Sequence, residues 1–397
     1  MIPAHDSRQA TKSTIIQAMI PPPTNGPIWI AKPDDLKRMV NDLVRSPILA
    51  VDTESNSLFA YHETVCLIQF STGEKDYLVD PLSIPDLSIL APIFADPERE
   101  KVFHAAEYDL ICMKRSFGFK FNNIFDTMVA SRILGKPSIG LGAMIESEFG
   151  ITLDKRYQRA NWGKRPLTDA MLAYARLDTF YLIPLRNRLK AALQEGDRWP
   201  LAMEDFCRLC QVHSPSLENG AEPWWRITGS QDLTPIQAAI LQELSNYRDE
   251  RAKAADVPPF KVLGNKDLLE VAKACPKNQE ELYSQTNISS NQIERHSGGM
   301  LQAVQRGLHA KPLYRPSYPR PDEQFLNRVD SLRNWRKLTG HNLGVESDVI
   351  LPREILELIA QNNPKRPEEL ADLMRPVPWR FERYGGQILN LLLQLEV

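Results

Sequence analysis

The strongest constraint on the fold is an internal repeat in the C-terminal part of the chain. Three blocks of sequence recur in the same order at an offset of 87 or 88 positions. The paired blocks are residues 266–271 and 353–358, residues 276–282 and 364–370, and residues 293–299 and 381–386. This part of the chain has helical periodicity and no strand signal. The repeat therefore predicts two small all-α domains, which we place at residues 230–310 and 322–397.

Residues 27–214 show a different pattern, in which short apolar runs alternate with helical periodicity. Four strands and one helix are predicted, namely strands 48–51, 65–70, 77–79 and 101–103 and helix 107–117. The second and third strands follow at hairpin-like distances, whereas the fourth begins a strand–helix alternation. This mixture predicts an α/β domain built on a mixed sheet.

Three further segments precede or connect these domains. Residues 1–26 end in a Pro-rich stretch and are predicted to be a disordered tail. Residues 215–229 contain two glycines and two prolines and are predicted to be a linker. Residues 311–321 are basic and Pro-rich, which predicts a stiff linker between the two helical domains.

Composition excludes several classes of protein. Lys and Arg number 48 and Asp and Glu number 50, for a formal net charge of −2. A protein that coats nucleic acid without specificity is strongly basic, so any nucleic acid must be held by a local patch. No apolar run approaches the ~18 residues of a membrane span, and the N-terminus does not read as a signal peptide. Five cysteines argue against a disulfide framework, so we expect a cytoplasmic protein with no membrane partner.

Two acids end the first predicted strand. Asp52 and Glu54 are two positions apart, so their side chains point to the same face of the strand. Neighbouring carboxylates repel, and burial raises the cost of charging both, so a positive charge has to compensate them. Hard divalent cations, which take oxygen ligands, meet that need. Such a pair of acids is common, however, and by itself is weak evidence of function.

Asp109, Tyr174 and Asp178 lie on predicted helices. Asp109 stands in the first turn of helix 107–117, where the helix dipole alone would favour an acid. Tyr174 and Asp178 are four residues apart, so the hydroxyl and the carboxylate project from one face of a helix. An ordinary hydrogen-bonded surface pair explains them equally well, so each signal is modest on its own.

A basic loop precedes the last of these motifs. Residues 155–165 contain five basic residues, two aromatic residues and no acid. Interleaved cations and rings suit a single nucleic-acid strand, because the charges follow phosphates and the rings stack on bases. The candidate substrate contacts are Arg156, Tyr157, Arg159, Trp162, Lys164 and Arg165. The alternative is a solvated loop in which Trp162 packs on its own domain.

Other residues that could bind metals or nucleotides are interpreted as structural. His104 has no second histidine near it in sequence and is interpreted as a packed or hydrogen-bonded side chain. Cys207 and Cys210 form a lone CxxC in a helical stretch, and we interpret them as buried helix residues rather than zinc ligands. The phosphate-binding pattern G-x-x-x-x-G-K-[ST] does not occur.

Taken in chain order, the acids and the tyrosine resemble a known pattern. D-x-E at a strand end, Asp at the start of a later helix and Y-x-x-x-D on a further helix is the pattern of DEDD-superfamily 3′–5′ exonucleases of the tyrosine subtype. The surrounding sequence is similar to the ribonuclease D family, and the helical repeats resemble its two tandem HRDC domains. The supporting segments are residues 125–127, 140–141, 153–155, 165–168 and 174–179, together with Trp162. The resemblance covers about residues 28–397, with a mild departure at Tyr108, where the family often has Phe before the second-motif Asp.

The resemblance implies a ribonuclease H-like exonuclease fold with a mixed sheet, and hydrolysis by two divalent metal ions, Mg²⁺ with Mn²⁺ able to substitute. It implies that Asp52 bridges both metal ions, while Glu54 and Asp178 complete the site of the attacking water. Asp109 would support the second ion, directly or through water, and Tyr174 would orient the attacking water and help to deprotonate it. The five residues Asp52, Glu54, Asp109, Tyr174 and Asp178 are thus the predicted catalytic set.

The implied substrate is RNA with a free 3′ end, tRNA precursors above all, which a monomer shortens to release nucleoside 5′-monophosphates. The HRDC domains would add weak nucleic-acid binding. Two alternatives stay open at this point. One is a DNA 3′–5′ exonuclease on the same fold, and the other is a nucleic-acid-binding protein that has kept the fold and lost the chemistry.

Overall fold

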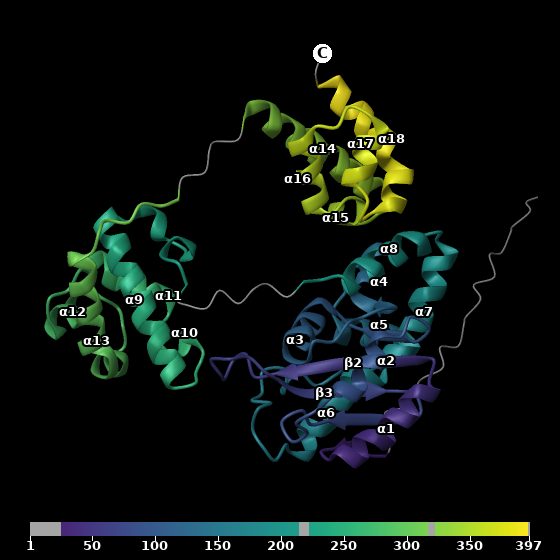
Figure 1. Cartoon of the computed structure of the whole chain (residues 1–397), viewed down its shortest axis with the longest axis horizontal. Helices are drawn as coiled ribbons and strands as arrows, with labels where there is room; N and C mark the ends of the chain where they lie inside the picture. Colours follow the sequence, from purple (N-terminus) through teal and green to yellow (C-terminus); the bar gives the residue numbers. More distant parts are fainter. Residues whose placement is uncertain (1–24, 214–221, 317–321, 396–397) are drawn as a thin grey trace, which may run out of the picture.

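The computed structural model describes residues 25–213, 222–316 and 322–395 (Figure 1). An α/β domain comes first and is followed by two helical domains. Nearly all of the predicted disordered tail lies outside the described residues, as do parts of both predicted linkers. No helix in the described ranges is long and apolar enough to cross a membrane.

A six-stranded mixed sheet forms the centre of the first domain. In spatial order its strands are β1 (Ile28–Ile30), β4 (Asp76–Val79), β3 (Val65–Ser71), β2 (Ile48–Ser55), β5 (Glu100–Phe103) and β6 (Ile124–Asp126). β2, β3 and β4 pair antiparallel, whereas β1, β5 and β6 each join the sheet in parallel. The predicted mixed sheet is therefore confirmed. β1 and β6, which the sequence did not reveal, are edge strands of three residues each.

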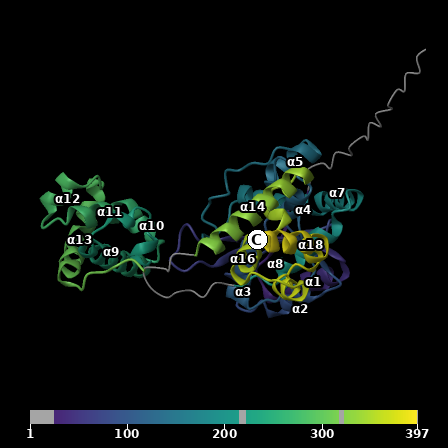
Figure 2. The same ribbon diagram turned by 90° about the horizontal axis from the view of Figure 1, so that it is seen from above.

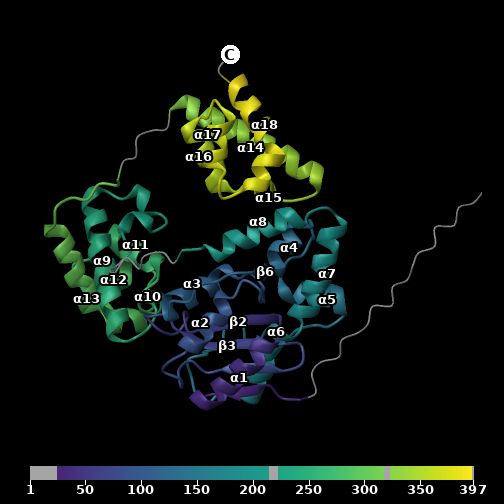
Figure 3. The same ribbon diagram turned by 45° about the vertical axis from the view of Figure 1, so that its right-hand side comes forward.

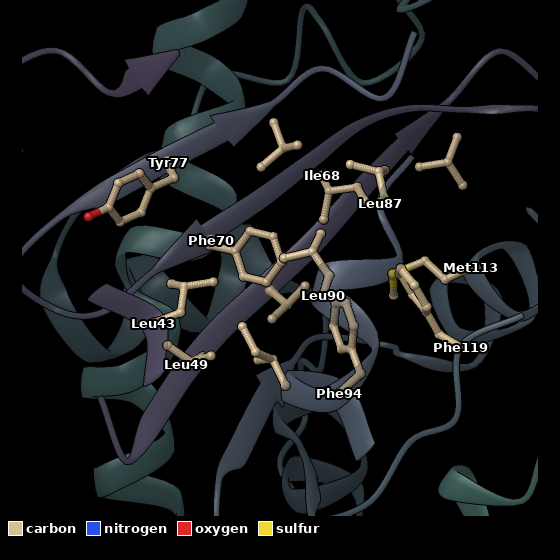
Figure 4. Packing of buried hydrophobic residues seen from close by; sticks show 14 of the residues in the cluster. Leu43, Leu49, Ile68, Phe70, Tyr77, Leu87, Leu90, Phe94, Met113 and Phe119 are labelled. Carbon is tan, nitrogen blue, oxygen red and sulfur yellow. The ribbon is translucent and has the colours of Figure 1, made fainter. Parts of the chain in front are cut away.

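Helices cover both faces of the sheet. On one face α1 (Pro33–Arg45), α2 (Ala91–Ala95) and α3 (Glu107–Phe117) share a core with β2, β3 and β4, part of which Figure 4 shows. Five helices belong to the other face, namely α4 (Thr127–Ile133), α5 (Leu141–Phe149), α6 (Asp169–Phe180), α7 (Leu182–Glu195) and α8 (Trp199–Cys210).

Successive side chains of β2 point to opposite faces of the sheet, and this alternation determines on which face the acids lie. Val51 packs into the core beneath α1 to α3, whereas Ala50 packs into the core of the opposite face. Asp52, two residues after Ala50, therefore points to the same face as Ala50. α6 lies across that face and packs against β2, β3 and β4. The fold thus places the predicted Y-x-x-x-D helix over the predicted D-x-E strand.

The two helical domains have five helices each in the described residues. The first comprises α9 (Pro235–Ala254), α10 (Pro259–Val262), α11 (Asn265–Ala274), α12 (Gln279–Gln285) and α13 (Ser290–His309). The second comprises α14 (Glu323–Leu343), α15 (Ser347–Ile350), α16 (Arg353–Asn362), α17 (Pro367–Leu373) and α18 (Pro378–Gln394). The predicted pair of all-α domains is confirmed.

The repeat extends to individual contacts. Arg248 of α9 donates a hydrogen bond to the carbonyl oxygen of Leu263 at 3.4 Å. Arg336 of α14 donates in the same way to the carbonyl oxygen of Leu351 at 2.9 Å. Donor and acceptor each lie 88 positions apart between the copies, so the same internal contact helps to fix both domains.

Part of the predicted linker 215–229 belongs to the first helical domain. Short 3₁₀ helices η2 (Trp224–Arg226) and η3 (Ser230–Asp232) precede α9. Trp224 and Ile227 are buried in the core of that domain. The described residues from 222 onward are therefore packed rather than a free connection, because their apolar side chains complete the helical core.

The second helical domain docks on α8 through a buried arginine (Figures 1 and 3). Arg380 of α18 is 0% exposed and forms ion pairs with Glu204 and, at 2.9 Å, with Asp205. The backbone N–H of Trp379 also donates to Glu204, at 2.6 Å. This interface fixes the second helical domain against the α/β domain.

The first helical domain stands to one side of the other two (Figure 2) and contacts the loop between β2 and β3. The Tyr61 hydroxyl donates to the Asp249 carboxylate at 2.7 Å. Lys261 Nζ lies 4.2 Å from the centroid of the Phe59 ring. The same loop leads back to the acids of β2, so this domain adjoins the predicted site.

Candidate active site

Three carboxylates meet where β2 ends and α6 crosses the sheet. One ligand oxygen from each of Asp52, Glu54 and Asp178 lies within 4.8 Å of the others. In the described part of the chain this is the one group of three or more His, Cys, Asp or Glu side chains close enough to share a metal ion. β2 supplies two of them from one face and α6 supplies the third, as the two periodicities predict.

Asp109 approaches this group from α3. It is 7% exposed and accepts a hydrogen bond from Thr53, which lies between Asp52 and Glu54 on β2. Asp109 is not a member of the group of three, but its charge helps to raise the pKa of Asp52. The fourth predicted acid therefore stands beside the cluster and interacts with it electrostatically.

Burial and mutual repulsion favour the protonated forms of these acids. Burial, together with repulsion from neighbouring carboxylates, raises the pKa of Asp52 well above its usual range and that of Glu54 to about 9. Burial also raises the pKa of Asp109 and of Asp178 to about 7. In the described part of the chain, none of these four acids forms an ion pair with Lys or Arg. An uncompensated all-oxygen cluster of this kind fits Mg²⁺ or Mn²⁺.

Tyr174 lies one turn before Asp178 on α6, a helix that the side chain of Thr168 caps. Its hydroxyl is close enough to the Asp178 carboxylate to act against the effect of burial on the pKa of that acid. Burial, and then the negative charge of the nearby acids, raises the pKa of Tyr174. The phenol therefore stays protonated near neutral pH and acts as a hydrogen-bond donor.

Two cavities adjoin the cluster. One of about 310 Å³ is lined by Asp52, Glu54, Asp109, Phe59, Tyr108 and Arg159, among others. The second, of about 270 Å³, is lined by Tyr174 and Asp178 together with Leu153, Arg156, Tyr157 and Leu177. The three clustered carboxylates are half-buried, and the cavities make them accessible to a substrate.

Four of the six predicted substrate contacts face these cavities or solvent. Arg159 lines the larger cavity and Arg156 the smaller one, and both side chains are exposed. Tyr157 meets Tyr174 edge to face, with ring centroids 6.0 Å apart. Lys164 is exposed on the same loop. Arg156, Tyr157 and Arg159 thus line the cavities beside the cluster, and Lys164 lies on the same loop.

Trp162 and Arg165 have structural partners instead. Trp162 is 1% exposed, and its ring lies 6.0 Å from that of Tyr174, so it packs on its own domain while forming part of the cavity wall. Arg165 forms an ion pair with Asp80 at 2.6 Å and donates to the carbonyl oxygen of Cys66 at 2.7 Å. Arg165 therefore braces the loop against the sheet, a contact that no sequence pattern indicated.

Glu63, in the loop between β2 and β3, is a site residue that sequence reasoning missed. Its carboxylate accepts hydrogen bonds from Ser55 at 2.9 Å and from the Tyr108 hydroxyl, and it pairs with Arg115 at 2.6 Å. These contacts tie the loop to α3 and hold the half-exposed Tyr108 ring at the larger cavity. Because the partners are 8 to 52 residues away in sequence, no local signal could have found them.

The other potential ligands are engaged elsewhere or unclustered. Nδ1 of His104 lies 2.9 Å from the Thr127 hydroxyl, which agrees with a hydrogen-bonded structural role. Cys210 is half-buried, whereas Cys207 is exposed, so the prediction that both are buried was wrong for Cys207. Its position on the solvent side of α8 explains the difference.

Comparisons with known proteins agree with this architecture. Residues 27–194 match the family model described as 3′–5′ exonuclease, and residues 237–304 and 325–392 each match the HRDC domain model. The chain is 33% identical to ribonuclease D of Escherichia coli over 306 residues. The aligned region covers 77% of this chain and 79% of that protein. The chain is 29% identical over 371 residues to ribonuclease D of Pseudomonas paraeruginosa, covering 92% and 97% of the two chains.

A solved structure shows the same arrangement. The crystal structure of Escherichia coli RNase D, described as an exoribonuclease involved in structured RNA processing, superposes with a TM-score of 0.67 at 26% identity, covering 93% of this chain and 99% of that one. The matched exonuclease region contains the strand and helices that carry Asp52, Asp109 and Asp178, and the two HRDC matches fall on the two helical domains. The protein therefore belongs to the ribonuclease D family of 3′–5′ exoribonucleases.

Proposed function

We propose that this exoribonuclease trims the 3′ ends of structured RNAs, tRNA precursors above all, by two-metal hydrolysis that releases nucleoside 5′-monophosphates. The proposal rests on one observation, the half-buried cluster of Asp52, Glu54 and Asp178 beside the buried Asp109, to which the described protein supplies no cation. Divalent cations bound there would activate water and offset the charge that develops on the phosphate and on the leaving oxygen.

The acids of the cluster would bind two cations, with a different role for each acid. Asp52, whose pKa the charges of the three other acids help to raise, would be the ligand shared by two cations. Glu54 and Asp178 would complete one cation site, and Asp109 would support the other. This division follows the family resemblance.

Tyr174 would orient the attacking water rather than deprotonate it. Its raised pKa keeps the phenol protonated, so it can donate a hydrogen bond but makes a poor general base near neutral pH. Tyr174 lies one turn before Asp178 on the same face of α6, so a water next to that carboxylate would lie within its reach. The expected contribution is one of geometry.

Substrate would reach the cluster through the larger cavity. The exposed Arg156, Arg159 and Lys164 would contact phosphates, and the Tyr108 ring would contact a base. The first HRDC domain contacts the loop between β2 and β3, so RNA bound to it would lead toward the cavity. We propose that the enzyme acts as a monomer in the cytoplasm.

The first experiment uses 5′-labelled single-stranded RNA, a matching DNA and a tRNA precursor with a 3′ extension, each with Mg²⁺ or EDTA. Wild type and Asp52→Asn are compared on denaturing gels. We expect a ladder that shortens from the 3′ end on RNA and is lost in EDTA and in the variant. Equal or faster cleavage of the DNA would assign the function to DNA. Absence of cleavage on all three substrates would refute the proposed reaction.

A further inference from the structure

Gln69 is a buried polar side chain without a partner. It lies in the middle of β3, is 0% exposed, and neither its Oε1 nor its Nε2 atom has a hydrogen-bond partner. It is the one side chain of the described residues with two such unpaired buried polar atoms of opposite type, a donor and an acceptor. Buried amides are almost always paired, so this exception requires an explanation.

The sheet register places Gln69 beside the cluster. Gln69 is directly opposite Asp52 in the antiparallel pairing of β2 with β3. Directly opposite residues point to the same face, with Cβ atoms about 4.5–5.5 Å apart. On its other side Gln69 is paired with Leu78 of β4, which packs with Ala175 of α6. The amide is therefore enclosed between β2, β4 and the helix that carries Asp178.

Two polar side chains of α6 on this face have partners of their own. Arg176 forms an ion pair with Asp76 of β4 at 2.5 Å, and the Thr179 hydroxyl donates to the carbonyl oxygen of Arg176 at 3.2 Å. Trp162 Nε1, whose ring packs in the same cluster as Leu78 and Ala175, is also unpaired, but it can only donate and so cannot accept from the Gln69 amide N–H. The Asp52 carboxylate, directly opposite Gln69, has several lone pairs and can accept from that N–H.

We propose that Gln69 is a positioning residue for the metal-binding carboxylates, whose Nε2–H donates to Asp52 once a divalent cation occupies the cluster. Carboxylates that bind metals are usually fixed by such outer hydrogen bonds. An amide suits this position because it donates without adding charge. A lysine or arginine there would neutralise the acids and compete with the cation. The inference rests on the proposed metal-dependent function.

The test compares the full-length wild type with Gln69→Met, which keeps the size of the side chain and removes the amide. We expect Mn²⁺ affinity, measured by isothermal titration calorimetry, to fall about 10-fold to 100-fold. Without metal, the melting temperature should be unchanged or higher, because an unpaired buried amide has been removed. A structural role predicts the opposite pair of results, a lower melting temperature and unchanged Mn²⁺ affinity, and would overturn the inference.

Two controls separate this inference from the proposed function. Leu78→Met changes the other cross-strand neighbour of Gln69, one strand further from Asp52, and should leave Mn²⁺ affinity unchanged. Asp52→Asn should abolish Mn²⁺ binding. If it binds Mn²⁺ like wild type, the metal proposal itself fails. If Asp52→Asn loses binding and Gln69→Met does not, only the role of Gln69 is refuted.

A structure of the wild type with Mn²⁺ provides a test that does not depend on the folding of a variant. We expect Gln69 Nε2 within about 3.2 Å of a carboxylate oxygen of Asp52. An amide that stays out of hydrogen-bonding range of Asp52 when Mn²⁺ is bound would contradict the inference.

Discussion

The protein holds two clusters of acids, and they differ in whether the chain supplies a cation to them. Under the second HRDC domain, Glu204 and Asp205 meet Arg380, which pairs with both. Burial raises the pKa of Glu204, but the adjacent Arg380 guanidinium acts against that shift. At the sheet, neighbouring acids instead add to the effect of burial on Asp52 and Glu54.

The difference separates a structural cluster from a binding one. Acids buried with a cation from the same chain form a fixed part of the fold, and removal of either partner leaves an unpaired charge. Acids buried without one retain the capacity to bind a cation from solution, at a cost in stability when no cation is present.

Asp52→Asn should produce the largest effect. We expect the rate of RNA trimming to fall at least about 1,000-fold, because a ligand central to the cations is lost. The free energy of unfolding without metal should be unchanged or higher, because one repelling carboxylate is gone. Gel assays and thermal melts measure the two quantities. The matched control is Asp205→Asn at the paired cluster, which should lose about 1–3 kcal/mol of stability instead. Similar stability losses in both variants would erase the contrast.

Arg380→Met should destabilise the protein by about 3–5 kcal/mol, because Glu204 and Asp205 are left buried and unpaired. Urea unfolding followed by circular dichroism measures the change. Gln292 occupies the corresponding position of the first repeat, 88 residues earlier, where it accepts a hydrogen bond from Ser289 at 2.8 Å. Gln292→Met should change stability by less than about 0.5 kcal/mol. Equal losses in the two variants would show that Arg380 does not hold an interface.

The stability of the metal-free enzyme should fall as pH rises from about 4 to 7. The pKa of Asp109 and of Asp178 is about 7 in the folded protein, above the unfolded value near 3.9, so the folded state binds more protons in this range. Each such proton contributes a slope of about 1.4 kcal/mol per pH unit. Thermal melts across this pH range test the prediction. Saturating Mg²⁺ should abolish the fall, and a slope unaffected by Mg²⁺ would count against a cation site at these acids.

Tyr61→Phe should have the smallest effect, about 0.5–1.5 kcal/mol, because the first HRDC domain is held here by a neutral hydroxyl on Asp249 rather than by a buried ion pair. A double-mutant cycle with Asp249→Asn isolates this contact. We expect slower trimming of the tRNA precursor and unchanged trimming of short single-stranded RNA. Equal slowing on both substrates would mean that the loop acts on the chemistry rather than on RNA placement.

Much of the fold could be predicted because its signals are local. The predicted helix 107–117 coincides with α3 (Glu107–Phe117), and the predicted strand 48–51 is the first half of β2 (Ile48–Ser55). The helical repeat was visible because both copies need the same apolar and capping positions. β1 and β6 were missed because a three-residue strand at a sheet edge has too few positions to show a period.

The candidate site divides in the same way. The pairs Asp52 with Glu54 and Tyr174 with Asp178 could be proposed because strand and helix periods fix the direction of each pair. Glu63, Gln69 and the bracing role of Arg165 could not, because each depends on partners from other elements.

Local patterns in the sequence predicted four of the six strands, the two similar helical domains that follow the catalytic domain, and which acids point together within one element. They did not predict that α6 lies across β2 and brings Asp178 to Asp52, that Gln69 stands unpaired beside Asp52, or that Arg380 pairs with one acidic cluster while the other has no cation from the described chain. The two kinds of feature depend on interactions over different distances along the sequence. Backbone periodicity acts over a few residues, whereas pairing of buried charges depends on contacts between residues as much as 176 positions apart.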